Sequence, residues 1–268
     1  MKTLLDVQQL TISTENKKKL VSECSFKIKQ GETLAIIGES GIGKSLTCKA
    51  LIGLYDPRLY CKGTINGFNS NFMSFKEKDW KRIRGRKIVM IMQNGNKAFN
   101  PSARIGSQLY TIMQSHFDVS KKEALEIFKV QCKLLELNDI EHILNAYPFE
   151  LSGGMLQRLM IVAALAMKPE IIIADEPTTA LDTITQFEVL EQLKKVQSLT
   201  DCAIVFVSHD LNVVKNIADD ILVMKDGKIV ESGKADDLLT KPKHVYTKYL
   251  LSSRQKVTDY FKEIAGGP

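Results

Sequence analysis

The sequence lacks the features of a secreted or membrane-spanning protein. Its five cysteines include no CxxC pair, so neither a disulfide framework nor a paired-thiol metal site is indicated. The longest apolar run, Leu159–Met167, is far shorter than the about 20 residues that cross a bilayer. No secretory signal is visible, because Asp6 interrupts the first apolar stretch. These absences predict a cytosolic chain with reduced thiols packed as small apolar groups.

Aromatic residues and histidines are also scarce. Aromatics make up 7% of the chain with a single tryptophan, and the four histidines include no pair at metal-ligand spacing. We therefore expect no metal held by His116, His142 or His244. The chain has 44% hydrophobic and 25% charged residues, which excludes disorder, collagen and coiled coil. Its net charge of +6 does not separate a nucleic-acid or membrane partner from a solvated surface.

Continuous apolar runs predict a parallel sheet that is buried on both faces. The runs span residues 33–38, 87–92, 171–175 and 203–208. Covering helices are expected at 44–54, 182–198 and 210–218. The alternating segments 4–13 and 24–29 favour antiparallel strands, and Asp226-Gly227 predicts a hairpin turn within 221–232.

Between about residues 94 and 168 the strand pattern gives way to helical periodicity. This change indicates a helical subdomain inserted into the α/β core. The stretch 94–106, which contains Gly95, Pro101 and Gly106, is expected to be a loop and hinge.

A phosphate-binding loop is predicted directly after the first buried run, at a GxxxxGK[ST] pattern followed by a helix. The pattern consists of Gly38, Glu39, Ser40, Gly41, Ile42, Gly43, Lys44 and Ser45, and Leu46 continues the helix. Glycines permit the tight backbone whose N–H groups face phosphate oxygens, and a helix N-terminus favours an anion. Lys44 would supply a compact positive charge to the phosphates, and the Ser45 hydroxyl can bind Mg²⁺.

Two acids end the buried run at 171–175. Asp175 and Glu176 would lie at the ligand-binding edge of an open α/β sheet. Asp175 fits the metal-side acid that accompanies a phosphate loop, and Glu176 is placed to polarise an attacking water. A plain pair of solvated strand-end acids is the alternative, and the phosphate loop earlier in the chain disfavours it.

Four further motifs follow in a fixed order. Gln93 closes the run 87–92, and Ser152 is the expected N-cap of a helix that begins Ser152-Gly153-Gly154-Met155. Ala180-Leu181-Asp182 and His209 come after the two acids. In this order the residues resemble the Q-loop, signature motif, D-loop and switch histidine of ABC-type ATPases.

The resemblance extends to the peptide/nickel subfamily of ABC importer ATPases over about residues 4–252. The segments that carry it include Ala98–Pro101, Tyr147–Arg158 and Lys241–Thr247. Met155 stands where most relatives have glutamine, and in this the chain resembles the ATPase of nickel importers most. The implied fold is α/β: a P-loop NTPase core with a mostly parallel sheet, an antiparallel β subdomain and an inserted α-helical subdomain. The implied bounds are 1–93 and 169–252 for the core, 94–168 for the helical subdomain and 253–268 for a C-terminal tail.

The resemblance also implies roles for single residues. ATP and Mg²⁺ would bind between two such subunits, with the phosphates on residues 38–46. Ser45, Gln93 and Asp175 would organise Mg²⁺. Glu176 would act on the water, and His209 would contact the γ-phosphate. Ser152, Gly153 and Gly154 would reach the partner's ATP, and Asp182 would belong to the D-loop.

The partners implied are those of an importer for nickel, metal-chelate complexes or short peptides. They are a second, similar but non-identical ATPase, two membrane permease subunits and, indirectly, an extracytoplasmic binding protein. The chain would lie peripherally on the cytoplasmic face of the membrane, with residues 94–106 receiving a short permease helix. One departure is that residues 13–17 contain no aromatic side chain, whereas relatives stack one on adenine.

The sequence leaves two alternative functions to consider. A DNA-associated ABC ATPase of repair or chromosome maintenance is suggested by the positive charge, but residues 46–151 contain neither long heptads nor a zinc module, so no nucleic acid is expected as a partner. A catalytically silent regulatory subunit is disfavoured because Lys44, Asp175, Glu176 and His209 are all present.

Overall fold

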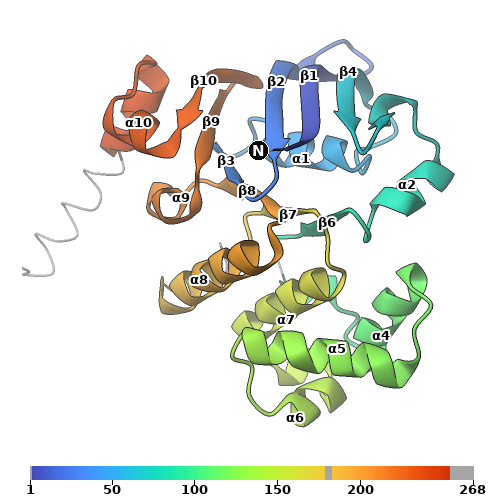
Figure 1. Cartoon of the computed structure of the whole chain (residues 1–268). Helices are drawn as coiled ribbons and strands as arrows, with labels where there is room; N and C mark the ends of the chain where they lie inside the picture. Colours follow the sequence, from blue (N-terminus) through green and yellow to red (C-terminus); the bar gives the residue numbers. More distant parts are fainter. Residues whose placement is uncertain (1, 94, 179–182, 254–268) are drawn as a thin grey trace, which may run out of the picture.

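The strands of the computed structural model form two sheets (Figure 1), and the structure describes residues 2–93, 95–178 and 183–253. The first sheet is antiparallel with the strand order β2-β1-β4-β5. Its strands are β1 (Thr3–Ser13), β2 (Lys19–Lys29), β4 (Tyr60–Gly67) and β5 (Ser70–Asn71). Alternating side chains of β1 and β2 face a core, as predicted.

The second sheet has six strands in the order β10-β9-β3-β8-β7-β6. They are β3 (Thr33–Ile37), β6 (Ile88–Ile91), β7 (Ile171–Asp175), β8 (Ala203–Ser208), β9 (Asp220–Lys225) and β10 (Lys228–Lys234). All neighbours pair in parallel except β9 and β10, which form the hairpin predicted at Asp226-Gly227. Every residue of β3, β7 and β8 is buried, which explains why their sequences are continuous apolar runs.

Helices cover this sheet near the predicted positions, with shifted ends. They are α1 (Lys44–Leu51), α8 (Thr183–Thr200) and α9 (Leu211–Ile217), whereas α10 (Ala235–Thr240) has no counterpart among the predicted helices. The first is shorter than expected because Gly53 adopts a positive φ of 63°. A Cβ at Gly53 would lie 2.4 Å from the Trp80 ring. That ring belongs to α2 (Glu77–Ile83), which the sequence patterns did not predict, as they did not predict β4 or the 3₁₀ turn Phe72–Ser74.

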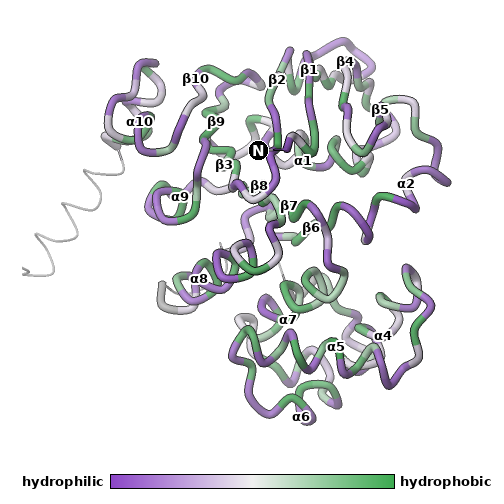
Figure 2. Tube along the Cα trace, viewed as in Figure 1, coloured by the Kyte–Doolittle hydropathy of each residue, from purple (hydrophilic) through white to green (hydrophobic). Residues whose placement is uncertain are grey.

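A layer of helices lies between β6 and β7 in the chain and below the sheets in Figure 1. It contains α3 (Gly95–Ala98), α4 (Ile105–His116), α5 (Lys121–Leu134), α6 (Ile140–Asn145), a 3₁₀ turn (Pro148–Glu150) and α7 (Gly153–Ala166). Buried side chains such as Phe128 and Leu159 form its core, and Figure 2 colours much of α7 hydrophobic.

The prediction of a loop over residues 94–106 is wrong at both ends of that stretch. Residues 95–98 form α3, and α4 already begins at Ile105. The reason is tertiary packing: Phe99 and Ile105 are both buried in the core of the helical layer, and a Cβ on Gly95 would lie 2.9 Å from the backbone nitrogen of Gln157 in α7. Local glycine and proline content could not reveal that contact.

The cysteines are free thiols, as predicted: four are buried and Cys61 is partly exposed. Among the helices in the described ranges, none is both long and apolar enough to span a bilayer.

Candidate functional site

The loop between β3 and α1 has a backbone that glycine makes possible. Gly38 has a φ of 145° and Gly43, the N-cap of α1, has a φ of 104°. A Cβ on Gly38 would lie 2.4 Å from the carbonyl oxygen of Met224, and one on Gly43 would lie 2.9 Å from that of Leu20. Both glycines therefore allow the loop to curl tightly against neighbouring backbone and leave its N–H groups at the start of a helix.

Lys44 lies within this loop rather than in solvent. Its side chain is buried, and Nζ donates hydrogen bonds to the carbonyl oxygens of Gly38 at 2.8 Å and Glu39 at 2.7 Å. Burial lowers the pKa of Lys44 from its ordinary value, while the nearby carboxylates of Glu176 and Asp175 oppose that change. The loop thus holds a positive charge at the helix N-terminus, a combination that suits a polyphosphate.

Ser45 and Asp175 come together from positions 130 residues apart. Ser45 Oγ donates to Asp175 Oδ1 at 2.8 Å. Asp175 is the last residue of β7 and is 8% exposed. Burial raises its pKa, and the Ser45 hydrogen bond opposes that shift. A hydroxyl and a carboxylate oxygen side by side are the ligand type that Mg²⁺ prefers, so the residues present fit that ion.

Glu176 is held in an unusual backbone conformation just after β7. Its φ is 48°, a left-handed value that costs a non-glycine residue about 1–2 kcal/mol. Its backbone N–H donates to the carbonyl oxygen of Val207 at 3.1 Å. Gln93 Nε2 donates to Glu176 Oε2 at 2.8 Å, and His209 Nδ1 lies 3.6 Å from Glu176 Oε1. The side chains of Gln93, after β6, and His209, after β8, therefore both lie at the carboxylate of Glu176, after β7.

The phosphate loop, Gln93 and Glu176 share one pocket of about 270 Å³, whereas His209 lines a second pocket together with Gly38 and Glu39. The lining residues of the first pocket are Leu20, Ser40, Gly41, Gly43, Lys44, Ser45, Leu46, Gln93 and Glu176. The pocket lies where β3, β6, β7 and β8 end, which is the ligand-binding edge of a parallel sheet. The phosphate loop, Gln93 and the two acids are thus brought together as the sequence predicted.

The Ser152-Gly153-Gly154 segment lies elsewhere. Ser152 is the N-cap of α7, as predicted, and its Oγ accepts a hydrogen bond from the Met155 N–H at 3.2 Å. Ser152 and Gly153 are exposed, and no described residue of α7 lines the pocket of the phosphate loop. Asp182, with Ala180 and Leu181, falls outside the described residues.

The sequence patterns did not predict the contacts of three residues near the site. Leu20 lines the pocket from β2. The Tyr246 hydroxyl accepts a hydrogen bond from the Glu39 N–H, and Gln157 Oε1 accepts one from the Gly95 N–H. Tyr246 belongs to the segment Lys241–Thr247 and Gln157 to the segment Tyr147–Arg158, and both segments indicate only the family resemblance. Neither motif indicates what its side chain contacts, because the partners are 207 and 62 positions away.

Comparison with known proteins places this geometry in a family. The family described as ABC transporter matches residues 21–179, which is more than half of the chain. The chain belongs to the ABC transporter family. The ABC ATPase is 48% identical to the metal-staphylopine import system ATP-binding protein CntD of Staphylococcus aureus, across 99% of this chain and 98% of that protein. It is 40% identical to the oligopeptide transport ATP-binding protein OppD of Bacillus subtilis, across 93% of this chain and 71% of that protein.

Solved structures agree with the fold. The bacterial ABC transporter cassette MJ0796 in dimeric form has a TM-score of 0.76 and 28% identity, covering 87% of this chain and 99% of that one. The same cassette bound to ADP and Pi has a TM-score of 0.74. The predicted ABC-type α/β fold is confirmed, and the chain is an ATP-binding, ATP-hydrolysing subunit of an ABC transporter. The DNA-associated alternative gains no support from these relatives.

Proposed function

We propose that this ABC ATPase drives the import of metal–metallophore complexes across a membrane. The observation that carries the proposal is its 48% identity with the metal-staphylopine importer subunit CntD over almost the whole of both chains. The oligopeptide subunit OppD is less similar, and this chain covers only 71% of it. Nickel belongs to the proposed cargo as a chelated ion, and short peptides are the second candidate cargo.

The phosphate loop is the proposed site for the ATP phosphates. The Lys44 ammonium and the N–H groups of residues 38–46 would bind the phosphate oxygens, except the N–H of Glu39, which donates to Tyr246. Lys44 would exchange its hydrogen bonds to the carbonyls of Gly38 and Glu39 for bonds to phosphate. Ser45 and Asp175, which already share a hydrogen bond, would hold Mg²⁺ together with Gln93. The ion would supply positive charge to the phosphates.

Glu176 is the proposed general base. Its carboxylate would accept a hydrogen bond from the attacking water and take its proton as the water oxygen bonds to the γ-phosphorus and the bond to the ADP oxygen breaks. Gln93 would hold the carboxylate through the bond at Oε2. His209, near the other carboxylate oxygen, would contact the γ-phosphate.

The exposed start of α7 is the proposed contact to a second ATPase subunit. Free N–H groups and a serine N-cap at a helix start attract an anion, and Ser152, Gly153 and Gly154 lie outside the chain's own pocket. They would complete the ATP site of a similar, non-identical ATPase arranged head to tail, and Asp182 would belong to that interface. The dimeric cassette MJ0796 supports such a pairing.

The remaining partners follow from the importer role. Two membrane permeases would hold the ATPase pair at the cytoplasmic face, with residues 94–106 as the docking region, and an extracytoplasmic binding protein would deliver the cargo. Residues 1–93 and 169–252 would act as the core and 94–168 as the helical subdomain, with 253–268 as a tail.

The test is ATPase activity in proteoliposomes that contain this chain, its neighbouring ATPase and both permeases. The binding protein would be loaded either with a nickel–metallophore complex or with a mixture of short peptides. We expect little activity from the chain alone and stimulation by the metallophore-loaded protein. Stimulation by the peptide-loaded protein instead would show that short peptides, the second candidate, are the cargo. Full activity of the chain alone, unaffected by permeases, would overturn the transporter assignment.

A further inference from the structure

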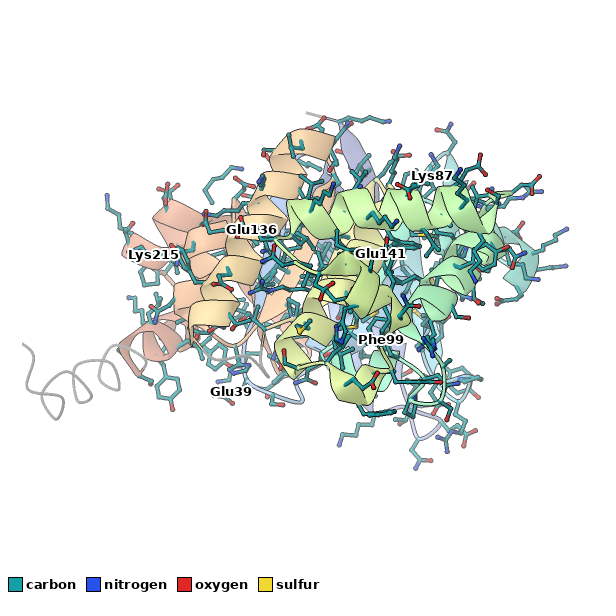
Figure 3. All side chains as sticks on the ribbon, turned by 90° about the horizontal axis from the view of Figure 1, so that it is seen from below. Glu39, Lys87, Phe99, Glu136, Glu141 and Lys215 are labelled. Carbon is teal, nitrogen blue, oxygen red and sulfur yellow. The ribbon has the colours of Figure 1, made fainter. Side chains whose placement is uncertain are left out.

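The segment Lys241–Thr247 touches the phosphate loop through one hydroxyl. The backbone N–H of Glu39, the second residue of the loop, donates a hydrogen bond to Tyr246 Oη at 3.2 Å. Tyr246 is buried and packs in the same hydrophobic cluster as Ile37, the last residue of β3. Figure 3 labels Glu39 at the edge of the molecule opposite Lys87. A residue near the end of the described chain thus contacts the first turn of the proposed ATP site.

The position of Tyr246 is set by the β9–β10 hairpin. The Glu231 carboxylate on β10 accepts hydrogen bonds from the N–H groups of Lys243 at 2.8 Å and His244 at 3.1 Å. The Tyr246 N–H donates to His244 Nδ1 at 3.1 Å, and Lys225 Nζ lies 5.1 Å from the centre of the Tyr246 ring. The hydroxyl is therefore held by the fold and not by the loop that it contacts.

The first turn of the loop is held from two sides. Lys44 Nζ binds the carbonyl oxygens of Gly38 and Glu39, and Tyr246 binds the N–H of Glu39. Under the proposed function, Lys44 transfers its hydrogen bonds to phosphate, and the two carbonyls lose that donor. The Tyr246 bond does not involve a group that phosphate needs, so it persists when ATP is bound.

We propose that Tyr246 is a positioning residue that keeps the first turn of the phosphate loop in its anion-binding shape, independently of Lys44. The inference rests on the proposed role of residues 38–46 as the phosphate site. A preorganised loop spends less binding free energy on ordering its backbone. Because the bond to Glu39 serves ATP and the transition state equally, its loss should raise KM and leave kcat unchanged.

The test compares Tyr246→Phe with the control Tyr55→Phe. The first substitution keeps the buried ring and removes only the acceptor of the Glu39 N–H. The control removes the hydroxyl of a half-buried tyrosine that bonds to Cys61. We expect Tyr246→Phe to weaken ATP binding and raise KM by about twofold to tenfold, the range for one neutral hydrogen bond. Amide hydrogen exchange of Glu39 in nucleotide-free protein should accelerate, while Tyr55→Phe changes neither measurement.

A double substitution tests whether the hairpin acts through the same bond. Glu231→Ala releases the 243–246 segment and should also weaken ATP binding. In Tyr246→Phe/Glu231→Ala the loss should be no larger than in Glu231→Ala alone, because both changes break one connection. Fully additive losses would show that Glu231 acts by another route and would overturn the proposed hairpin connection.

Lys44→Ala, measured in the same series, separates this inference from the proposed function. If Lys44→Ala binds ATP as well as the parent chain, the phosphate site itself is wrongly assigned. If Lys44→Ala loses ATP but Tyr246→Phe matches the parent in affinity, KM and Glu39 exchange, the phosphate site stands and the role of Tyr246 is refuted.

Discussion

Two helix N-termini of this ABC ATPase offer the same local chemistry in different surroundings. The start of α1 is enclosed: Lys44 is 4% exposed, Glu176 and Gln93 line the same pocket, and Asp175 bonds to Ser45. The start of α7 is open: Ser152 and Gly153 are exposed, and the Ser152 side chain caps the helix by accepting a hydrogen bond from the Met155 N–H. Both ends present N–H groups and a positive dipole end. The difference shows that a helix N-terminus forms a complete anion-binding site only where residues at the ends of neighbouring strands also contribute side chains.

A buried side chain of α7 contacts the segment that follows Gln93 at the enclosed end. Gln157, one turn after the start of α7, accepts a hydrogen bond from the N–H of Gly95, which lies two positions after Gln93. Gln93 in turn donates to Glu176. The hydrogen bonds of Gln93 and Gly95 thus lie two positions apart in the chain, one at each helix start, although the chemistry of the two starts is separate.

The largest expected effect concerns the enclosed end. Glu176→Gln should reduce ATP hydrolysis by about 10²–10⁴-fold, the usual contribution of a positioned general base, with ATP binding retained. Phosphate release by the assembled transporter and ATP binding to the variant would measure this. Glu170→Gln, which alters a half-buried partner of Lys87, is the control and should hydrolyse ATP normally. Equal turnover of Glu176→Gln and the parent chain would remove Glu176 from the mechanism.

The next effect is on binding at the same end. Lys44→Ala should weaken ATP affinity by about 10-fold to 100-fold, because charged hydrogen bonds contribute about 1.5–3 kcal/mol each. Titration with a fluorescent ATP analogue would report the change. Lys81→Ala, at an exposed lysine of α2, should bind ATP like the parent. An unchanged affinity of Lys44→Ala would contradict the phosphate role.

A paired comparison of N-caps tests the open end. Ser152 caps α7 and Ser120 caps α5, and both helices have 14 residues. Ser152→Ala and Ser120→Ala should each lower the free energy of unfolding by about 1 kcal/mol. In the assembled transporter, only Ser152→Ala should also reduce ATPase activity, by about tenfold if one charge-assisted hydrogen bond to the partner's ATP is lost. Denaturant unfolding and ATPase assays would show this, and equal activities would refute the contact across the dimer.

The smallest effect concerns the connection between the two ends, and the chain offers a matched control. Gln157 accepts one backbone N–H at Oε1, and Gln192 donates to the Leu135 carbonyl from Nε2 at 3.1 Å. In each, the other amide atom has no hydrogen-bond partner among the described residues. Gln157→Leu and Gln192→Leu should therefore change stability by similar amounts, within about 1 kcal/mol.

Only Gln157→Leu should alter catalysis, since Gly95 follows Gln93 closely in the chain. We expect about a twofold to fivefold loss of kcat in the assembled transporter, from a bond of ordinary strength. Gln192→Leu should keep the parent rate. If both variants lose activity together, the effect of Gln157→Leu comes from general loosening of the helical layer and the two ends are not connected through it.

The sequence predicted most of the enclosed end because its chemistry is local. The phosphate loop, the strand before it and the helix after it occupy one continuous segment, and the strand-end positions of Asp175, Gln93 and His209 follow from buried apolar runs. By contrast, the sequence patterns do not predict β4. Its sequence Tyr60–Gly67 has two glycines and a largely exposed burial pattern, so no apolar period marks it.

By itself, the sequence determined the parallel sheet, the glycine-dependent loop and the serine cap of α7, because each depends on neighbouring residues and their periodicity. Tertiary structure alone decided the hydrogen bonds from Ser45 to Asp175, from Glu39 to Tyr246 and from Gly95 to Gln157. It also turned residues 95–98 into a helix against α7. Such contacts join positions far apart in the chain, and their partners are chosen by packing, which local propensity does not encode.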